Sequence, residues 1–236
     1  MNLILIDKND KVEENKVILR GRRLKHILEI LKSVPGDLLT AGRLNGLVGT
    51  AEVVNISEES VELDLKLDKQ PPRPLDLTLI LALPRPIVLN RLLMTVTTLG
   101  VKNLFLIHSN QVEKSYWNSP VLDEKSMEEQ LILGLEQARD TILPSVNLRK
   151  KFKPFVEDEL PRIIKGSTAL IAHPVIPHAS LKAVYGPVTL MIGPERGFIP
   201  YEIEMLQKLG LKTFSMGERI LKVETAVCSA IGKLFL

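Results

Sequence analysis

Apolar and polar residues alternate over residues 61–68, which predicts a strand with one buried and one solvent-facing side. This strand is Val61–Leu67, and three further strands are predicted over Leu3–Ile6, Asp37–Ala41 and Leu47–Ile56. Asn45-Gly46, between the second and third of these, is typical of a hairpin turn. Several short strands together with one short helix, about Leu24–Leu31, indicate a small β-barrel.

The segment Gln70-Pro71-Pro72-Arg73-Pro74 interrupts both helix and strand, because proline lacks a backbone donor and restricts the residue before it. It divides the chain into a domain of residues 1–70 and a domain of residues 75–236. The second domain alternates strands with helices, the pattern of a mainly parallel sheet covered on both faces. The predicted strands are Leu77–Leu83, Lys102–Ile107, Thr168–Ala172, Val188–Ile192 and Lys212–Ser215. The predicted helices cover about 89–99, a long segment opened by Ser119-Pro120, Pro200–Leu209 and Val223–Phe235.

Composition excludes several classes of protein. No apolar run approaches the roughly 18 residues of a membrane span, and the first ten residues do not resemble a signal peptide, so we expect a cytoplasmic protein without membrane attachment. The single cysteine, Cys228, excludes an internal disulfide and is expected in the core. The four histidines are scattered, and we expect no metal.

The net charge of +3 matters less than the position of the charges. Residues 16–32 contain six basic side chains and one acid, and residues 149–153 add four basic side chains and no acid. Each run is compatible with a solvated surface or with a site for an anionic partner such as RNA.

Three loops follow predicted strands of the parallel sheet, where α/β proteins bind ligands. They are Ala172–Pro174, Gly193–Phe198 and Met216–Leu221. Gly193 and Gly197 allow the backbone to approach a flat ligand, although a Gly-Pro turn after a strand is also an ordinary turn. The chain lacks the glycine patterns of dinucleotide and phosphate loops and the nucleophile elbow of α/β hydrolases.

Two motifs in order, IGPERGF at Ile192–Phe198 and MGERILKVETA at Met216–Ala226, resemble the RsmE family of 16S ribosomal RNA methyltransferases, which modify ring nitrogen 3 of a uridine. Weaker similarity covers Arg23–Asp37, Leu99–Val101 and Glu136-Gln137. The resemblance implies an amino-terminal PUA-like β-barrel that binds RNA and a carboxyl-terminal SPOUT domain, an α/β fold with a deep trefoil knot. It also implies a homodimer, S-adenosylmethionine (SAM) as methyl donor, and 16S rRNA or the small ribosomal subunit as partner.

The resemblance places the cofactor pocket at a set of loop residues: Ala172, His173, Gly193, Glu195, Gly197, Met216, Gly217, Ile220, Leu221, Thr225 and Ala226. With the barrel in place, the first basic run becomes a candidate RNA site formed by Arg20, Arg22, Arg23, Lys25 and Lys32. Aromatic residues are only 4% of the chain, so phosphate and shape contacts are expected to dominate over base stacking.

Methylation of a uridine nitrogen needs aligned reactants, a cation to stabilise charge on the ring, and a proton acceptor. Arg219 or Lys222 is the candidate cation, and Glu195 or Glu224 the candidate acceptor. A salt bridge or a helix N-terminal interaction is the alternative role for each carboxylate.

The chain departs from the usual family pattern at Thr95, Thr98, Asp140, Arg196 and Lys222, which leaves the modified nucleotide open. One alternative function is a SPOUT methyltransferase with another product, on a ribose 2′-hydroxyl or on another base of transfer RNA. Another is a ribosome-assembly factor that binds RNA without catalysis.

Overall fold

The computed structural model describes residues 2–174 and 184–235, and it divides into two compact units. Unit 1 contains Met1–Arg73 together with Leu131–Leu143, and unit 2 contains Pro74–Gln130 and Pro144–Leu236. The proline-rich segment therefore lies at a boundary between units. The sequence assigned residues 131–143 to the second domain, whereas their contacts group them with the first unit.

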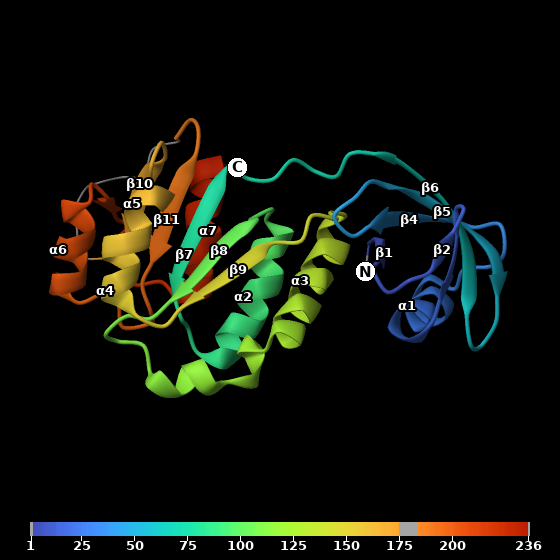
Figure 1. Cartoon of the computed structure of the whole chain (residues 1–236), viewed down its shortest axis with the longest axis horizontal. Coiled ribbons are helices and arrows are strands. Elements are labelled where there is room, and N and C mark those ends of the chain that lie inside the picture. Colours follow the sequence, from blue (N-terminus) through green and yellow to red (C-terminus); the bar gives the residue numbers. More distant parts are fainter. Residues whose placement is uncertain (1, 175–183, 236) are drawn as a thin grey trace. The chain divides into compact units, whose positions relative to one another are not determined.

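Unit 1 is built on a six-stranded sheet in the order β1-β4-β5-β6-β3-β2 (Figure 1). The strands are β1 (Ile4–Ile6), β2 (Val12–Glu13), β3 (Lys16–Leu19), β4 (Leu38–Arg43), β5 (Val48–Ile56) and β6 (Val61–Lys69). Only β1 and β4 pair in parallel. The sheet is an open, curled half-barrel with β1 and β2 at its edges. As the alternation predicted, Val61, Leu63 and Leu65 are buried in its core.

The helix of unit 1 begins earlier than predicted, with α1 (Gly21–Lys25) continuing into the π-helix η1 (His26–Leu31). Strands β2 and β3 were not predicted. In β3, Val17 and Leu19 are buried while Ile18 is 56% exposed, so the three consecutive apolar residues hide the alternation that marks a strand.

The carboxyl-terminal part of α3 (Glu124–Ala138) packs within unit 1. Its Leu135 is fully buried in a small cluster with Leu3 and Leu5. The backbone N–H of Asn2 donates to the Glu136 carbonyl at 3.0 Å. The Arg22 guanidinium donates two hydrogen bonds, of 2.7 and 2.8 Å, to the buried carboxylate of Glu136.

Unit 2 contains a six-stranded sheet in the order β12-β10-β11-β7-β8-β9, in which every pair is parallel. The strands are β7 (Leu77–Ala82), β8 (Asn103–Ile107), β9 (Ser145–Arg149), β10 (Thr168–Ala172), β11 (Val188–Ile192) and β12 (Lys212–Phe214). The helices are α2 (Pro86–Thr98), α3, α4 (Phe152–Pro154), α5 (Leu160–Ile163), α6 (Pro200–Lys208) and α7 (Val223–Phe235). Short turns are η2 (Lys114–Asn118), η3 (Pro120–Leu122) and the π-helix η4 (Phe155–Glu159).

The predicted strands and helices of unit 2 are present, with two differences. Ser119-Pro120 opens the 3₁₀ turn η3, and the long helix begins later, at Glu124. The sequence missed β9 and the helical stretch 152–163, because basic residues follow the strand and Pro154 and Pro161 lie within the helices.

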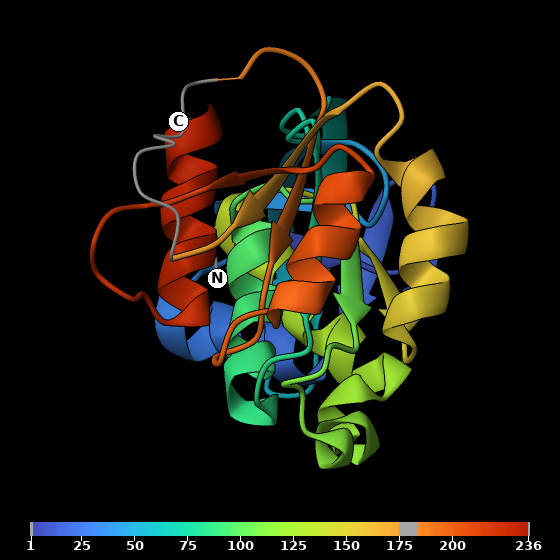
Figure 2. The same cartoon turned by 90° about the vertical axis from the view of Figure 1, so that its left-hand side faces the viewer.

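The helices cover both faces of the sheet, with α2 and α7 in contact on one face and α5 and α6 on the other (Figures 1 and 2). This follows from right-handed crossovers, since the chain moves from β7 to β8 in one direction along the sheet and from β11 to β12 in the other. Every residue of β11 is buried. All carboxyl ends of the strands lie at one edge, which we call the carboxyl edge. No helix among the described residues is long and apolar enough to span a membrane.

Candidate functional site

A cavity of about 90 Å³, partly open to solvent, lies at the carboxyl edge beyond β10, β11 and β12. The three loops singled out from the sequence form its wall. The lining residues are Ala172, His173, Pro174, Ile192, Gly193, Pro194, Glu195, Gly197, Phe198, Met216, Gly217, Arg219, Ile220, Leu221, Val223 and Ala226.

The structure brings together every cofactor residue expected from the resemblance except Thr225. Thr225 is exposed on α7 and does not line the cavity, whereas its neighbour Ala226 does. Of the candidate catalytic residues, Arg219 and Glu195 line the cavity, whereas Lys222 and Glu224 do not.

Sequence reasoning missed several lining residues. They are Pro174, Ile192, Pro194, Phe198 and Val223. Four of them lie inside the two quoted motifs, and Phe198 is an apolar residue in an otherwise polar loop. That feature was an available signal for a buried wall.

Three glycines allow the loops to approach a ligand. A Cβ on Gly193 would lie 3.1 Å from the Phe198 backbone nitrogen and 3.2 Å from Phe198 Cδ2, so a side chain there would press on the loop. Gly197 and Gly217 have φ of +75° and +118°, which other residues rarely adopt, and a Cβ at either position would enter open space. The wall is therefore made partly of bare backbone.

Carboxylates fix the loop after β11. Oε1 of Glu195 accepts a hydrogen bond of 3.0 Å from the backbone nitrogen of Arg85, directly before α2. Glu202, in the first turn of α6, is only 3% exposed. Its Oε2 accepts from the Ile199 backbone nitrogen at 3.1 Å and its Oε1 from the Asn110 backbone nitrogen at 2.7 Å. These contacts tie the loop to the ends of β7 and β8.

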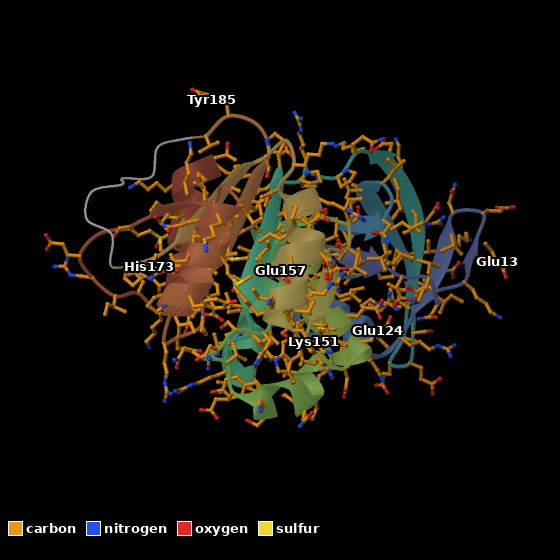
Figure 3. All side chains as sticks on the ribbon, turned by 60° about the vertical axis from the view of Figure 1, so that its left-hand side comes forward. Glu13, Glu124, Lys151, Glu157, His173 and Tyr185 are labelled. Carbon is orange, nitrogen blue, oxygen red and sulfur yellow. The ribbon has the colours of Figure 1, made fainter. Side chains whose placement is uncertain are left out.

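His173 follows β10 at the cavity, and Figure 3 labels it there. Its backbone nitrogen donates to the Phe214 carbonyl at 3.0 Å, which extends the pairing of β10 with β12. Burial lowers the pKa of the His173 imidazole below its usual value, so the ring is neutral near pH 7. Among the described residues no group of His, Cys, Asp and Glu has the arrangement of a metal site. His178 lies outside the described residues.

The candidate RNA residues of unit 1 fall into two groups. Arg20, Lys25 and Lys32 are exposed. Arg22 binds Glu136, and the Arg23 guanidinium, only 16% exposed, binds Asp10 and the Leu5 carbonyl. The guanidinium groups of Arg22 and Arg23 are thus both paired with carboxylates, although Arg22 is still 53% exposed.

Most departures from the family pattern have a local explanation. The hydroxyls of Thr95 and Thr98 donate to backbone carbonyls one turn earlier in α2. Asp140, only 3% exposed, accepts from the backbone nitrogens of Thr141 and Ile142 and shapes the turn after α3. Arg196 and Lys222 are exposed.

One expectation about α7 was wrong. Cys228 was expected in the core, but it is exposed because it lies on the outer side of the helix, opposite Val227 and Ala230.

Comparison with known proteins matches residues 71–234 to the model of an RNA methyltransferase domain. The chain is 31% identical over 237 residues to the ribosomal RNA small subunit methyltransferase E of Treponema pallidum, covering 98% of this chain and 89% of that protein. It is 24% identical to the ribosomal RNA small subunit methyltransferase E 1 of Borreliella burgdorferi, covering 98% and 95%.

Among solved structures, the ribosomal RNA small subunit methyltransferase E of Neisseria gonorrhoeae, bound to SAM, superimposes with a TM-score of 0.73 at 21% identity. The match covers 98% of this chain and 95% of that one. This likeness establishes the fold, a SPOUT α/β domain preceded by a small curled β-sheet. The family model and the 31% identical relative establish more than the fold. The chain belongs to the RNA methyltransferase family and, within it, to the RsmE family of ribosomal RNA small subunit methyltransferases.

Proposed function

We propose that this protein transfers a methyl group from SAM to ring nitrogen 3 of a uridine in the 16S RNA of the small ribosomal subunit. The observation that carries the proposal is the glycine-walled cavity beyond β10, β11 and β12, in a chain of the RsmE family. The cavity contains all but one of the residues that the family resemblance assigns to the cofactor.

The lining of the cavity fits SAM. Ile192, Phe198, Ile220 and Leu221 offer apolar contacts for a flat purine ring, and the backbone at Gly197 and Gly217 is accessible to polar groups. Bound there, SAM supplies an electrophilic methyl group on a sulfonium. The neutral imidazole of His173 adds no positive charge beside a cationic ligand.

We assign Arg219 as the cation that stabilises negative charge on the uridine ring as nitrogen 3 loses its proton. It lines the cavity, while Lys222 lies outside the lining. A fixed positive charge beside the ring is effective because it requires no reorganisation when the charge develops.

We assign Glu195 as the proton acceptor. Glu195 lines the cavity, and its Oε1 accepts a hydrogen bond from the Arg85 backbone nitrogen, which fixes the position of the carboxylate. Glu224 lies in the first turn of α7, where a carboxylate interacts favourably with the helix N-terminus, and we assign it that structural role.

We assign RNA binding to the domain of residues 1–70 and catalysis to the domain of residues 75–236. Arg20, Lys25 and Lys32 are the RNA-binding candidates, because their side chains are exposed. Arg22 and Arg23 would contribute to the RNA site chiefly by holding α1 against Glu136 and Asp10.

We further propose a homodimer that works in the cytoplasm without a metal ion. The dimer is supported by Ile87 and Met94, which are 66% and 39% exposed on α2. A second copy of the chain would cover these apolar side chains. Light scattering on the purified protein tests the dimer.

The experiment that tests the function is transfer of labelled methyl from SAM to small ribosomal subunits, naked 16S RNA and bulk transfer RNA, all from a strain lacking this gene. Nucleoside analysis then identifies the product. Label recovered as 3-methyluridine in subunits or 16S RNA supports the proposal. Label on a ribose or in transfer RNA would replace it with another SPOUT activity, and SAM binding without transfer would replace it with a non-catalytic assembly factor.

A further inference from the structure

Unit 2 carries a second group of positive side chains at the carboxyl edge, beyond β8 and β9. Lys150 and Lys151 directly follow β9, and Lys114 begins the turn η2 that follows β8. All three are exposed, and we call them the edge lysines. They belong to the second basic run of the sequence and to the loop after β8, and neither the cofactor cavity nor unit 1 uses them.

The edge lysines differ from the neighbouring basic residues, which form ion pairs. Arg149 binds Glu159 through Nε at 2.7 Å, and Lys153 lies 3.7 Å from Glu157. The edge lysines form no ion pair within the part of the chain that the structure describes. Their positive charge is therefore available to a partner, although the exposed Glu113 beside Lys114 reduces it.

An aromatic residue organises the edge lysines. Nε1 of Trp117 donates a hydrogen bond of 3.0 Å to Nδ1 of His108, the residue after β8. Burial lowers the pKa of His108, which favours the neutral ring, and only a neutral ring has a nitrogen that can accept this bond. Nζ of Lys150 lies 5.9 Å from the centre of the Trp117 ring, within the range of a cation–π interaction. Trp117, the single tryptophan of the chain, thus holds Lys150, which follows β9, close to the loop after β8.

The edge lysines adjoin the cofactor cavity. Phe152 follows Lys151 directly, and its ring centre lies 6.2 Å from that of Phe198, which lines the cavity. The hydrogen bond from Asn110 to Glu202 joins the loop after β8 to the start of α6. Figure 3 labels Lys151 at the start of the helical stretch 152–163, and it also labels Glu157 within that stretch. These contacts connect the wall of the cavity to the segment that follows β9 and to the loop after β8.

We propose that Lys114, Lys150 and Lys151 bind phosphates of the substrate RNA next to the target nucleotide, with Trp117 positioning Lys150. The proposal rests on the proposed function, because the target base must reach the cavity for methyl transfer. An RNA strand that enters the cavity carries its phosphates across the adjacent surface, where lysine side chains neutralise them. A single half-buried tryptophan is too little for a stacking platform, so the site tracks the backbone and not the base sequence.

The test replaces all three edge lysines with glutamine and measures RNA binding by fluorescence anisotropy over a range of salt concentrations. The association constant for RNA falls with salt, and the loss of three phosphate contacts makes the slope of its logarithm against log salt less negative by about 2. Binding near 0.15 M salt becomes roughly tenfold to fiftyfold weaker. SAM affinity and melting temperature stay unchanged, since the lysines are exposed and line no part of the cavity.

A matched control exists in the same unit. Lys165, Lys208 and Lys212 are exposed and form no ion pair among the described residues, but they lie at the opposite edge, where β10 and β12 begin. Their triple replacement with glutamine removes the same charge and leaves RNA binding at the wild-type level. An equal loss of RNA affinity in both triple variants would mean that only the net charge matters, which would overturn the proposal. Unchanged RNA affinity in both variants would overturn it as well.

Kinetics separate this proposal from the proposed function. With wild-type protein active on 16S RNA, the edge-lysine variant has a KM for RNA raised at least tenfold and a kcat near normal. An unchanged KM in an active enzyme overturns the edge site alone. An inactive wild type overturns the proposed function instead, whatever the binding data. Trp117→Phe keeps the ring under Lys150 and retains most of the affinity, whereas Trp117→Ala loses part of it.

Discussion

The ion pair between Arg22 and Glu136 joins residues 114 positions apart, and its removal gives a sharp test of how unit 1 is stabilised. The Glu136 side chain is 1% exposed, and its two oxygens accept from both terminal nitrogens of Arg22. Replacement of Arg22 with alanine leaves a buried carboxylate without this partner. We expect a marked loss of stability.

The magnitude follows from the burial of the two partners. Breaking a fully buried ion pair costs about 3–5 kcal/mol. Arg22 is 53% exposed, so water screens part of the interaction and the expected loss is about 2–3 kcal/mol. Glu136→Gln keeps the volume and removes the buried charge, so it costs about 1 kcal/mol. The double variant Arg22→Ala with Glu136→Gln is expected to resemble the Glu136→Gln single variant, with a coupling energy of about 2–3 kcal/mol.

The assay is urea unfolding followed by circular dichroism, because Trp117, the single tryptophan, lies in unit 2 and its fluorescence reports on that unit. Lys25→Ala is the control. Lys25 and Glu29 are 3.9 Å apart and both exposed, so this change costs less than about 0.5 kcal/mol. An Arg22→Ala protein as stable as the control, or additive effects in the double variant, would refute the reasoning.

Three further predictions concern unit 2. Arg219→Ala lowers kcat at least a hundredfold while SAM affinity by calorimetry stays within a few fold, and a parallel loss of SAM binding would make Arg219 a structural residue. Gly217→Ala places a side chain at φ +118° in the cavity wall. We expect a loss of about 1–3 kcal/mol in the free energy of unfolding and SAM binding weakened at least tenfold. Unchanged SAM binding would remove this loop from the cofactor site. The pKa values of His108 and His173 are lowered in the folded protein, so the unfolded chain binds protons first, and stability falls as pH drops through the usual value of 6.5. His173→Gln makes the pH dependence of the unfolding free energy between pH 7 and 5.5 shallower, and an unaltered dependence would contradict a lowered pKa of this half-buried ring.

Sequence patterns predicted the elements whose burial follows a regular period. The alternation in β6 corresponds to one buried face. The sequence of β11, apolar except for Thr189, corresponds to two buried faces. Strand β3 escaped prediction because Ile18 is an exposed apolar residue between two buried ones. Exposure of that kind depends on the neighbouring strands, which the local sequence does not reveal.

The candidate site was predicted at the level of loops and less well at the level of single side chains. The rule that ligands bind beyond the carboxyl ends of parallel strands selected the three loops that line the cavity. Thr225, by contrast, depends on the direction in which α7 leaves the loop. The partners of Arg22 and Arg23, which are Glu136 and Asp10, could not be predicted because only the fold brings them together.

The two acids Glu195 and Glu202 explain why cofactor and RNA surfaces can be coupled in unit 2. Glu195 ties the loop after β11 to the start of α2, and Glu202 ties the same region to the loop after β8. Phe198 lies between these two acids in the sequence. It lines the cavity, and its ring contacts the ring of Phe152, the residue after Lys151. RNA bound at those lysines would therefore press on a loop whose position shapes the cavity. Phe198→Ala is expected to weaken SAM and RNA binding together, whereas replacement of the edge lysines affects RNA alone. That contrast separates a shared support from a contact that serves only one ligand.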